Sequence, residues 1–421
     1  MEKREYALFS KLQGLFGNQS EKNIYSTELL SVCLFCDNKK MIDVSNERLI
    51  EHFPARKTKE SITVKTSELG TDNEWIEHFL LTNFRNSDWI QRKHMGGYFF
   101  NVKSQDGVNI TIWCTKHNPH YGVKTFSPNQ MIESVFQKKE EGMCVLVEIN
   151  SDIFLLYTSE DPYTDLVPMR LIRSLLMRPF ILQNYVYFHS AAIKYKGVGV
   201  LLCGGSGYGK TTTLLQLLSS KECQIVANDK VFIKHDTLHN AVVWGWPTVV
   251  TLGVGTMSHY EELKRFLTDI SDVSCLQDLY GYNPNRAYLT LTDEEMKALP
   301  KEGNKLVISH KQLANLFKRS ICAKCEIHAI ISVNLKWDSE ENKLIEILDI
   351  PEKEKIIQNN ILRNISDQLS WAGYPELNSN ENDINTLTEI TKSVKFFELQ
   401  ANFNDASLAN FLEQVVDYVS V

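Results

Sequence analysis

The sequence predicts an α/β protein in two parts, a smaller α+β domain over residues 1–160 and a larger α/β domain over residues 161–421. The chain has 421 residues, more than one ordinary domain, and 43% of them are hydrophobic, enough to build sizeable cores. Residues 158–165 are polar and contain a proline, which is typical of a linker. Beyond them, a strand, a glycine-rich loop and a helix follow one another around residue 204.

Local patterns predict the elements of the first part. They are helices over 6–16, 74–84 and 131–139, a strand over 29–35, and two hairpins formed by 97–102 with 108–113 and by 144–149 with 153–157. None of these segments carries a residue pattern that indicates chemistry.

The second part alternates strands and helices. The predicted strands are 185–193, 198–203, 225–231, 327–333, 344–348 and 394–399, and the predicted helices are 169–182, 212–218, 352–371 and 406–418.

Charge and cysteine usage narrow the class of protein. The formal net charge of -7 argues against nucleic acid or an anionic membrane surface as the main partner. No apolar run approaches the length of a membrane span, and the first residues, Met-Glu-Lys-Arg-Glu, lack the apolar segment of a signal peptide. We therefore expect a cytoplasmic protein. The nine cysteines favour reduced thiols, and Cys33/Cys36 and Cys322/Cys325 favour buried side chains over a zinc site.

The glycine-rich stretch fits the phosphate-binding motif G-x-x-x-x-G-K-[ST]. It lies between the apolar strand 198–203 and the apolar helix 212–218, which is the context that the motif requires. The predicted nucleotide-binding residues are Gly204, Gly205, Ser206, Gly207, Tyr208, Gly209, Lys210, Thr211 and Thr212.

Each residue type in this loop has a physical reason. Glycines let the backbone curl its N–H groups around a phosphate, and the following helix N-terminus attracts anions. Lys210 can reach the β and γ phosphates, and the Thr211 hydroxyl can hold Mg²⁺. The predicted cofactors are therefore ATP and Mg²⁺.

Around the loop the chain resembles a known family. The run 188–193, the strand 199–202, the loop, and the run 225–231 look like the C-terminal domain of HPr kinase/phosphorylase and the HPr-kinase-like proteins, which include peptide kinases of natural-product clusters. The resemblance is specific over about residues 165–235. It implies a phosphate-loop domain with a mixed sheet wrapped by helices, related to phosphoenolpyruvate carboxykinases. It also implies catalytic roles for His189, Lys210, Asp229 and Asn228, with Thr211 and Asp229 at the metal.

One position departs from the family's pattern. The family has paired aspartates where this chain has Asn228 and Asp229. Because an amide cannot accept a proton near neutral pH, either the base that deprotonates the acceptor hydroxyl lies elsewhere, or the chemistry is slow, or the alignment with the family is off by one residue. His189 and Asp229 are the two candidates, and Asp229 is also a candidate Mg²⁺ ligand.

The expected function is ATP- and Mg²⁺-dependent phosphorylation of a serine or threonine hydroxyl on a protein or peptide acceptor. One alternative is a regulatory or scaffold module that hydrolyses ATP slowly, and another is a nucleotidyl-transferring enzyme. Residues 1–160 are expected to bind the acceptor or to mediate assembly, and a homo-oligomer is an open possibility.

Overall fold

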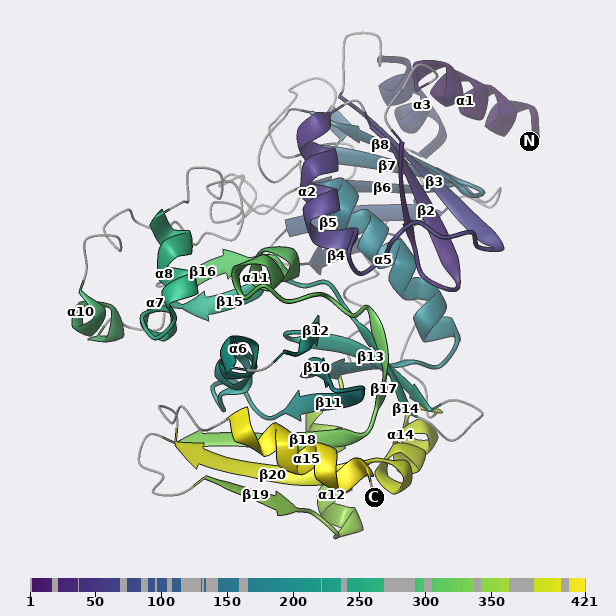
Figure 1. The fold of residues 1–421 in the computed structure, drawn as a ribbon. Helices are drawn as coiled ribbons and strands as arrows, with labels where there is room; N and C mark the ends of the chain where they lie inside the picture. Colours follow the sequence, from purple (N-terminus) through teal and green to yellow (C-terminus); the bar gives the residue numbers. More distant parts are fainter. Residues whose placement is uncertain are drawn as a thin grey trace. The chain divides into compact units, whose positions relative to one another are not determined.

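The computed structural model divides into two compact units, each of which is described by itself (Figure 1). Unit 1 is Met1–Gln183 with Asn364–Asn378, and unit 2 is Asn184–Arg363 with Ser379–Val421. The sequence had suggested a boundary between residues 160 and 161, whereas helix α5 (Val167–Leu182) falls in unit 1. The structure describes residues 2–16, 22–36, 38–68, 74–84, 90–94, 97–103, 108–114, 130, 132–133, 143–158, 166–220, 222–235, 241–268, 292–298, 305–336, 342–362, 382–402 and 409–420.

Unit 1 is built on an eight-stranded sheet in the order β1-β2-β3-β8-β7-β6-β5-β4. Its strands are β1 (Lys22–Ser26), β2 (Leu30–Phe35), β3 (Glu60–Glu68), β4 (Ile90–His94), β5 (Gly97–Lys103), β6 (Asn109–Cys114), β7 (Met143–Ile149) and β8 (Asp152–Tyr157). The β2–β3 and β3–β8 pairs are parallel and the others antiparallel, so the sheet is mixed.

Both faces of this sheet are buried at its centre. On β7, Val145 and Val147 join a core with Leu8 and Leu12 of α1 (Glu2–Leu15) and with the helix α3 (Glu74–Phe84). The alternate residue Leu146 is also buried, on the opposite face. Helix α5 contacts strands β2 and β3 of this sheet and also packs against helix α2 (Lys39–Leu49). The sequence had predicted an α+β first part with local hairpins, and the parallel pairs β2–β3 and β3–β8 were not anticipated, because no strand was predicted at β3.

The two hairpins predicted in the first part are confirmed as β5–β6 and β7–β8. Strands β1, β3 and β4 and helix α2 lie where no element was predicted. The helix predicted over 131–139 lies almost wholly outside the described residues.

Unit 2 contains a six-stranded mixed sheet in the order β12-β10-β11-β18-β20-β19. These strands are β10 (Ala191–Tyr195), β11 (Val198–Cys203), β12 (Gln224–Ala227), β18 (Ala329–Lys336), β19 (Lys343–Glu346) and β20 (Lys395–Asn402). The β11–β18 and β18–β20 pairs are parallel, so β11, β18 and β20 all run in one direction. The sheet is mixed because β10 and β19 run against these neighbours.

A second, four-stranded sheet has the order β17-β14-β13-β9, and β15 pairs with β16. The strands are β9 (Val186–His189), β13 (Lys230–His235), β14 (Ala241–Gly245), β15 (Val250–Gly253), β16 (Lys305–Ile308) and β17 (Lys324–Ile327). The helices of unit 2 are α6 (Lys210–Ser220), α7 (Val254–Met257), α8 (Glu261–Thr268), α10 (Asp293–Ala298), α11 (His310–Leu316), α12 (Ile350–Asn360), α14 (Asn382–Ser393) and α15 (Phe411–Ser420).

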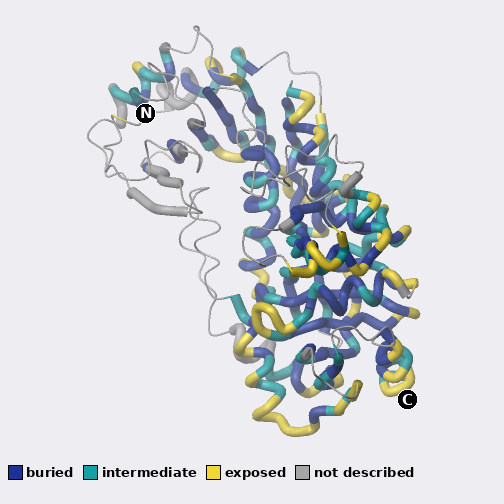
Figure 2. Tube along the Cα trace, turned by 90° about the vertical axis from the view of Figure 1, so that its left-hand side faces the viewer, coloured by how far each residue is buried: buried dark blue, intermediate teal, exposed yellow. Residues whose placement is uncertain are grey.

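Strand β11 is buried on both faces along its whole length. Figure 2 shows such buried segments of the chain in dark blue and exposed ones in yellow. Val200 and Leu202 pack in one core with Leu214 and Leu218 of α6. Leu201 and Cys203 pack in a second core with residues of β9, β13 and β14. The run 198–203 is apolar at every position because neither face meets water.

Three strands that the sequence predicted as continuous are each two strands. The predicted strand 225–231 breaks at Asn228 and Asp229, so that β12 lies in the six-stranded sheet and β13 in the four-stranded one. The predicted strand 185–193 breaks at Ser190, so that β9 joins the four-stranded sheet and β10 the six-stranded one. The predicted strand 327–333 breaks at His328, and β17 and β18 separate in the same way. In all three cases apolar residues on both sides of the break are buried in one shared core, so the apolar pattern alone does not reveal that the chain changes sheet.

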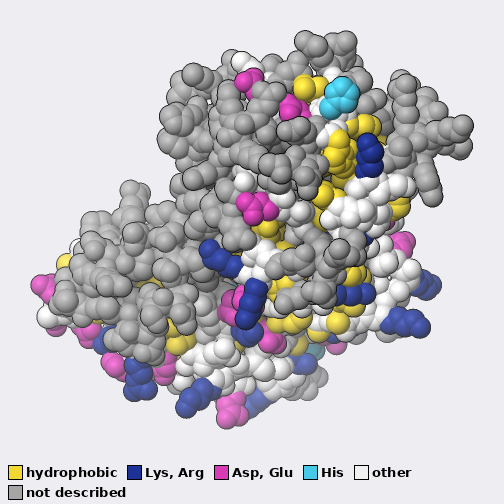
Figure 3. Space-filling model, turned by 90° about the horizontal axis from the view of Figure 1, so that it is seen from above, with side chains coloured by type: hydrophobic (Ala, Val, Ile, Leu, Met, Phe, Trp, Pro, Cys, Tyr) yellow, Lys and Arg dark blue, Asp and Glu magenta, His cyan; other side chains and the backbone are white. Residues whose placement is uncertain are grey.

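The predicted helix 352–371 also differs, because α12 ends at Asn360 and Ile361 is already extended. The remaining predicted elements of unit 2 appear within a few residues of their expected ends. Among the residues that the structure describes, no helix is both long enough and apolar enough to cross a bilayer. In Figure 3, Lys and Arg side chains alternate with Asp and Glu side chains along the lower part of the view.

The two sheets of unit 2 approach each other closely at Gly199. Its N–H donates to Nδ1 of His328 at 3.1 Å, and the His328 N–H donates to the Gly199 carbonyl at 2.9 Å. A Cβ added to Gly199 would overlap the backbone oxygen of Glu326. Glycine is therefore required here by space rather than by its φ angle.

We expect Gly199→Ala to lower the free energy of unfolding by about 3 kcal/mol, the upper end of overpacking costs, because a backbone oxygen cannot move aside. Gly197→Ala is the matched control, since its Cβ would meet open space and only the positive φ of 86° opposes it. That control should cost roughly 1 kcal/mol. Urea unfolding of the full chain measures both, and equal losses would contradict the steric account.

Candidate functional site

The phosphate-loop motif occupies the turn between β11 and α6. Gly204, Gly207 and Gly209 all have positive φ, at 142°, 83° and 99°, which is the region that favours glycine. Added Cβ atoms would meet the Val333 carbonyl oxygen at 2.9 Å from Gly204 and Leu335 Cδ1 at 2.5 Å from Gly209. The glycines thus allow both the curled backbone and its close approach to β18.

Backbone hydrogen bonds fix the loop in this conformation. The Tyr208 N–H donates to the Gly205 carbonyl at 3.3 Å, and the Leu335 N–H donates to the Tyr208 carbonyl at 3.1 Å. The Tyr208 side chain is half exposed, at 50%. Gly205, Ser206 and Gly207 are exposed as well, so the crest of the loop faces solvent.

Lys210 is the first residue of α6, and its side chain is buried. Its Nζ donates to the carbonyls of Gly204 at 2.7 Å and Gly205 at 3.1 Å. Burial lowers the pKa of Lys210, and the negative charge of Asp229 acts in the opposite direction. The ammonium is therefore held over the curled backbone, where the motif places a phosphate. Thr211 is half-buried beside it and Thr212 is buried.

His189 and Asp229 form a pair close to this lysine. His189 ends β9 and pairs in register with Lys230 of β13, which places Asp229 beside it. The His189 Nε2 lies 3.0 Å from Asp229 Oδ1, and the Lys230 Nζ lies 3.6 Å from Asp229 Oδ2. Both members of the pair are half-buried, with about a third of each side chain exposed (31% and 34%).

The pKa of Asp229 is lowered. Burial alone would raise it, but the hydrogen bond from His189 and the charges of Lys230 and Lys210 outweigh burial. Asp229 is therefore a stable carboxylate that can hold a cation or orient an imidazole. Since Lys210 contributes to this shift, the loop lysine and the His189–Asp229 pair belong to one electrostatic site.

Asn228 faces inward, next to this pair. It is buried, and within the described part of the chain its Oδ1 has no hydrogen-bond partner. Its backbone N–H donates to Nε2 of the buried His310 at 3.0 Å. His310 begins α11, which is fixed at that end by a capping box of Ser309 and Gln312. The turn that carries Asp229 is thus anchored from α11.

The sequence did not indicate Asn360, the last residue of α12. It is buried, its Oδ1 accepts the Gly204 N–H at 3.3 Å, and its Nδ2 donates to the Ile356 carbonyl at 2.7 Å. Ile361 then bridges to Phe188, and the Leu362 N–H donates to the Tyr187 carbonyl at 2.9 Å. One short segment therefore contacts both the loop and β9. A lone asparagine far from the motif in sequence gives no signal of this role.

These residues fit the cofactors that the motif implies. Thr211 offers one hydroxyl and Asp229 one ionised carboxylate, and the described ranges contain no cluster of three His, Cys, Asp or Glu side chains that could hold a metal. Mg²⁺ commonly binds through one or two protein oxygens together with phosphates and water, so this donor set suits it. Cys33, Cys36, Cys322 and Cys325 are free thiols, and the two pairs belong to different units.

Comparisons with known proteins add little to this picture. No family model matches the chain, and no curated protein matches it. Among solved structures, the chain is similar to the Hpr(Ser) kinase/phosphatase from Coxiella burnetii, at 11% identity and a TM-score of 0.24. That similarity covers 55% of this chain and 94% of the other. Identity and TM-score are too low to assign the chain to a family, so its class is that of a mixed α/β protein with a phosphate-loop motif.

We expect Asn360→Ala to weaken nucleotide binding by about twofold to tenfold, the effect of one lost hydrogen bond. Asn360→Asp keeps an acceptor for the Gly204 N–H but adds a negative charge at the loop, so it should weaken binding more. The exposed neighbour Asn359 provides the control Asn359→Ala. Titration with a fluorescent ATP analogue measures the affinities, and unchanged binding in both Asn360 variants would contradict the role assigned to this residue.

Proposed function

We propose that the protein is an ATP- and Mg²⁺-dependent phosphotransferase that phosphorylates a serine or threonine hydroxyl of a protein or peptide. The observation that carries this proposal is geometric: the glycine-rich loop holds the buried Lys210, whose Nζ lies 2.7 Å from the Gly204 carbonyl, and His189 Nε2 lies 3.0 Å from Asp229 Oδ1 in the same unit. A loop that binds phosphate beside a possible proton acceptor is the minimum that transfer to a hydroxyl requires.

In this proposal the loop amides and Lys210 bind the β and γ phosphates of ATP. Thr211 and Asp229 would hold Mg²⁺, which when bound neutralises charge on the phosphates. Lys210 is suited to the task because it is buried and already directed at the loop backbone. Such positioned charges supply most of the catalysis in phosphoryl transfer.

His189 is the better candidate for the base. Since its Nε2 faces the ionised Asp229, Nε2 carries the proton and Nδ1 is left as the acceptor. The lowered pKa of Asp229 makes that carboxylate a poorer base than an ordinary aspartate. The acceptor oxygen forms a bond to the γ phosphorus while the bond to the bridging oxygen breaks. The hydroxyl proton passes to Nδ1 of His189, and ADP leaves.

Asn228 supports a second candidate function. A buried amide stands where a second carboxylate would serve as base, which favours a regulatory or scaffold module that hydrolyses ATP slowly. Under the main proposal, residues 1–160 bind the acceptor or mediate assembly, as extra domains on catalytic cores often do.

Product analysis tests the proposal. The full chain is incubated with ATP, Mg²⁺ and a library of serine- and threonine-containing peptides, and we expect phosphopeptide plus ADP. Lys210→Ala should abolish turnover and weaken ATP binding, because it removes the buried cation at the phosphates. Release of ADP and phosphate alone would support the slow ATPase instead, and AMP with pyrophosphate would indicate nucleotidyl transfer. Undiminished activity of Lys210→Ala would refute all three.

The choice of base has its own test. We expect His189→Ala to lower the transfer rate by ~10²–10⁴-fold with little change in ATP affinity, the usual cost of losing a general base. Asn228→Asp should preserve or raise the rate, since it restores a carboxylate beside Asp229. Single-turnover kinetics separate the chemical step from binding. If His189→Ala transfers phosphate at the wild-type rate, the base is elsewhere and Asp229 becomes the first residue to test.

A further inference from the structure

A cavity of about 970 Å³ lies in unit 2 at the edge of the six-stranded sheet where β18 and β20 begin. The phosphate loop follows the other end of this sheet, because β11 runs parallel to β18 and the loop comes after its last residue, Cys203. The cavity is therefore separate from the site described above. Its volume is in the range of sites that bind ligands of a few hundred daltons.

The charged lining of this cavity is unbalanced. Three carboxylates, of Glu326, Glu346 and Asp417, face one ammonium, of Lys395. Lys395 Nζ already lies 3.4 Å from Glu346 Oε1. Neither Glu326 nor Asp417 has an ion-pair partner among the residues that the structure describes, and both are exposed. Two carboxylates thus remain available to a ligand.

His328 does not supply the missing positive charge. Its Nδ1 accepts the Gly199 N–H at 3.1 Å, so that nitrogen carries no proton and the ring is neutral. The proton then sits on Nε2. Two backbone hydrogen bonds also fix the position of His328. Its N–H donates to the Gly199 carbonyl, and its carbonyl accepts the Lys395 N–H.

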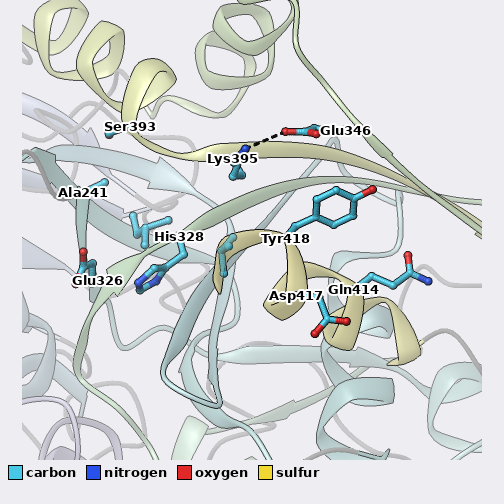
Figure 4. Close-up of a pocket in the computed structure, with 11 residues that line it drawn as sticks. Ala241, Glu326, His328, Glu346, Ser393, Lys395, Gln414, Asp417 and Tyr418 are labelled. Atoms are coloured by element: carbon cyan, nitrogen blue, oxygen red, sulfur yellow. Dashed lines mark hydrogen bonds and ion pairs between the residues drawn. The ribbon is translucent and has the colours of Figure 1, made fainter. Parts of the chain in front are cut away.

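The uncharged part of the lining combines the polar residues Ser393 and Gln414 with apolar and aromatic side chains. Ile327 is buried, and the Tyr418 ring packs on Phe397 with centroids 5.4 Å apart while 49% of the residue stays exposed. Figure 4 shows Glu326 and His328 toward one side of the cavity and Gln414, Asp417 and Tyr418, all from α15, toward the other. Carboxylates near an exposed aromatic ring suit a cation on an apolar stem, such as a lysine or arginine side chain.

We propose that this cavity binds a peptide segment in which a lysine or arginine is flanked by apolar residues. The basic side chain lies between Glu326 and Asp417, and an apolar neighbour packs on Tyr418. A single arginine side chain would not fill about 970 Å³, which is why a segment of several residues fits better than a small amine. The site goes beyond the proposed function, since it lies at the opposite edge of the sheet from the loop and needs no nucleotide.

The test measures binding rather than phosphate transfer. A fluorescein-labelled peptide of alternating leucine and arginine is titrated with the full chain by fluorescence anisotropy, without ATP, beside a matched peptide with glutamate in place of arginine. We expect saturable one-to-one binding of the basic peptide only. The double variant Glu326→Gln/Asp417→Asn should weaken it by about threefold to tenfold, since partly exposed ion pairs contribute modestly.

The matched control removes the same charge elsewhere. Glu222 and Glu294 are exposed and lie outside the cavity lining, so Glu222→Gln/Glu294→Gln should leave the affinity unchanged. The double variant Glu326→Lys/Asp417→Lys leaves one carboxylate beside three ammonium groups in the lining, so it should reverse the preference toward the glutamate peptide. Equal losses in the two double variants, or unchanged affinity in Glu326→Gln/Asp417→Asn, would overturn the proposal, as would binding of both peptides alike. Failure of the phosphotransferase proposal would leave all these outcomes unaltered.

Discussion

The burial of β11 on both faces is the constraint on which unit 2 depends. The strand packs against α6 on one side and against the four-stranded sheet on the other, so every side chain from 198 to 203 meets protein. Polar residues are excluded from it, and any shift in register would be opposed from both sides. The loop that follows Cys203 therefore begins from a fixed point. A rigid origin of this kind lets a short glycine-rich turn present its backbone in one conformation.

The chain also crosses between the two sheets of unit 2 at short breaks in its strands. The breaks at Ser190 and His328 send β9 and β17 to one sheet and β10 and β18 to the other. The first break is what brings His189 beside Asp229, since β9 then pairs with β13 rather than continuing beside β11. The site thus combines a loop from one sheet with a histidine from the other.

The division of the chain between two sheets explains which features the sequence could predict and which it could not. The loop and its flanking strand and helix follow from a local motif, and their ends were predicted within two residues. The break at Ser190 was missed because the apolar residues Phe188 and Ala191 lie buried on either side of the His189-Ser190 step, and two polar residues within an apolar run are also common in an unbroken strand. Asn360 and His310 were missed for a different reason. Each acts through one hydrogen bond across a long sequence separation, to Gly204 and to Asn228, and such contacts leave no periodicity to detect.

The end of α12 has a consequence for how the site would respond to an anion bound at the loop. Asn360 accepts a hydrogen bond from the Gly204 N–H of the loop. The next two residues, Ile361 and Leu362, contact Phe188 and Tyr187 of β9, just before His189. A short segment that is hydrogen-bonded at both ends can transmit a displacement from one contact to the other. An anion that accepted the Gly204 N–H would replace Asn360 as its hydrogen-bond partner. A resulting shift of Asn360 would be passed through Ile361 and Leu362 to β9, which ends at His189. If the loop binds a phosphate, these contacts would link its occupancy to the position of His189 through three consecutive residues.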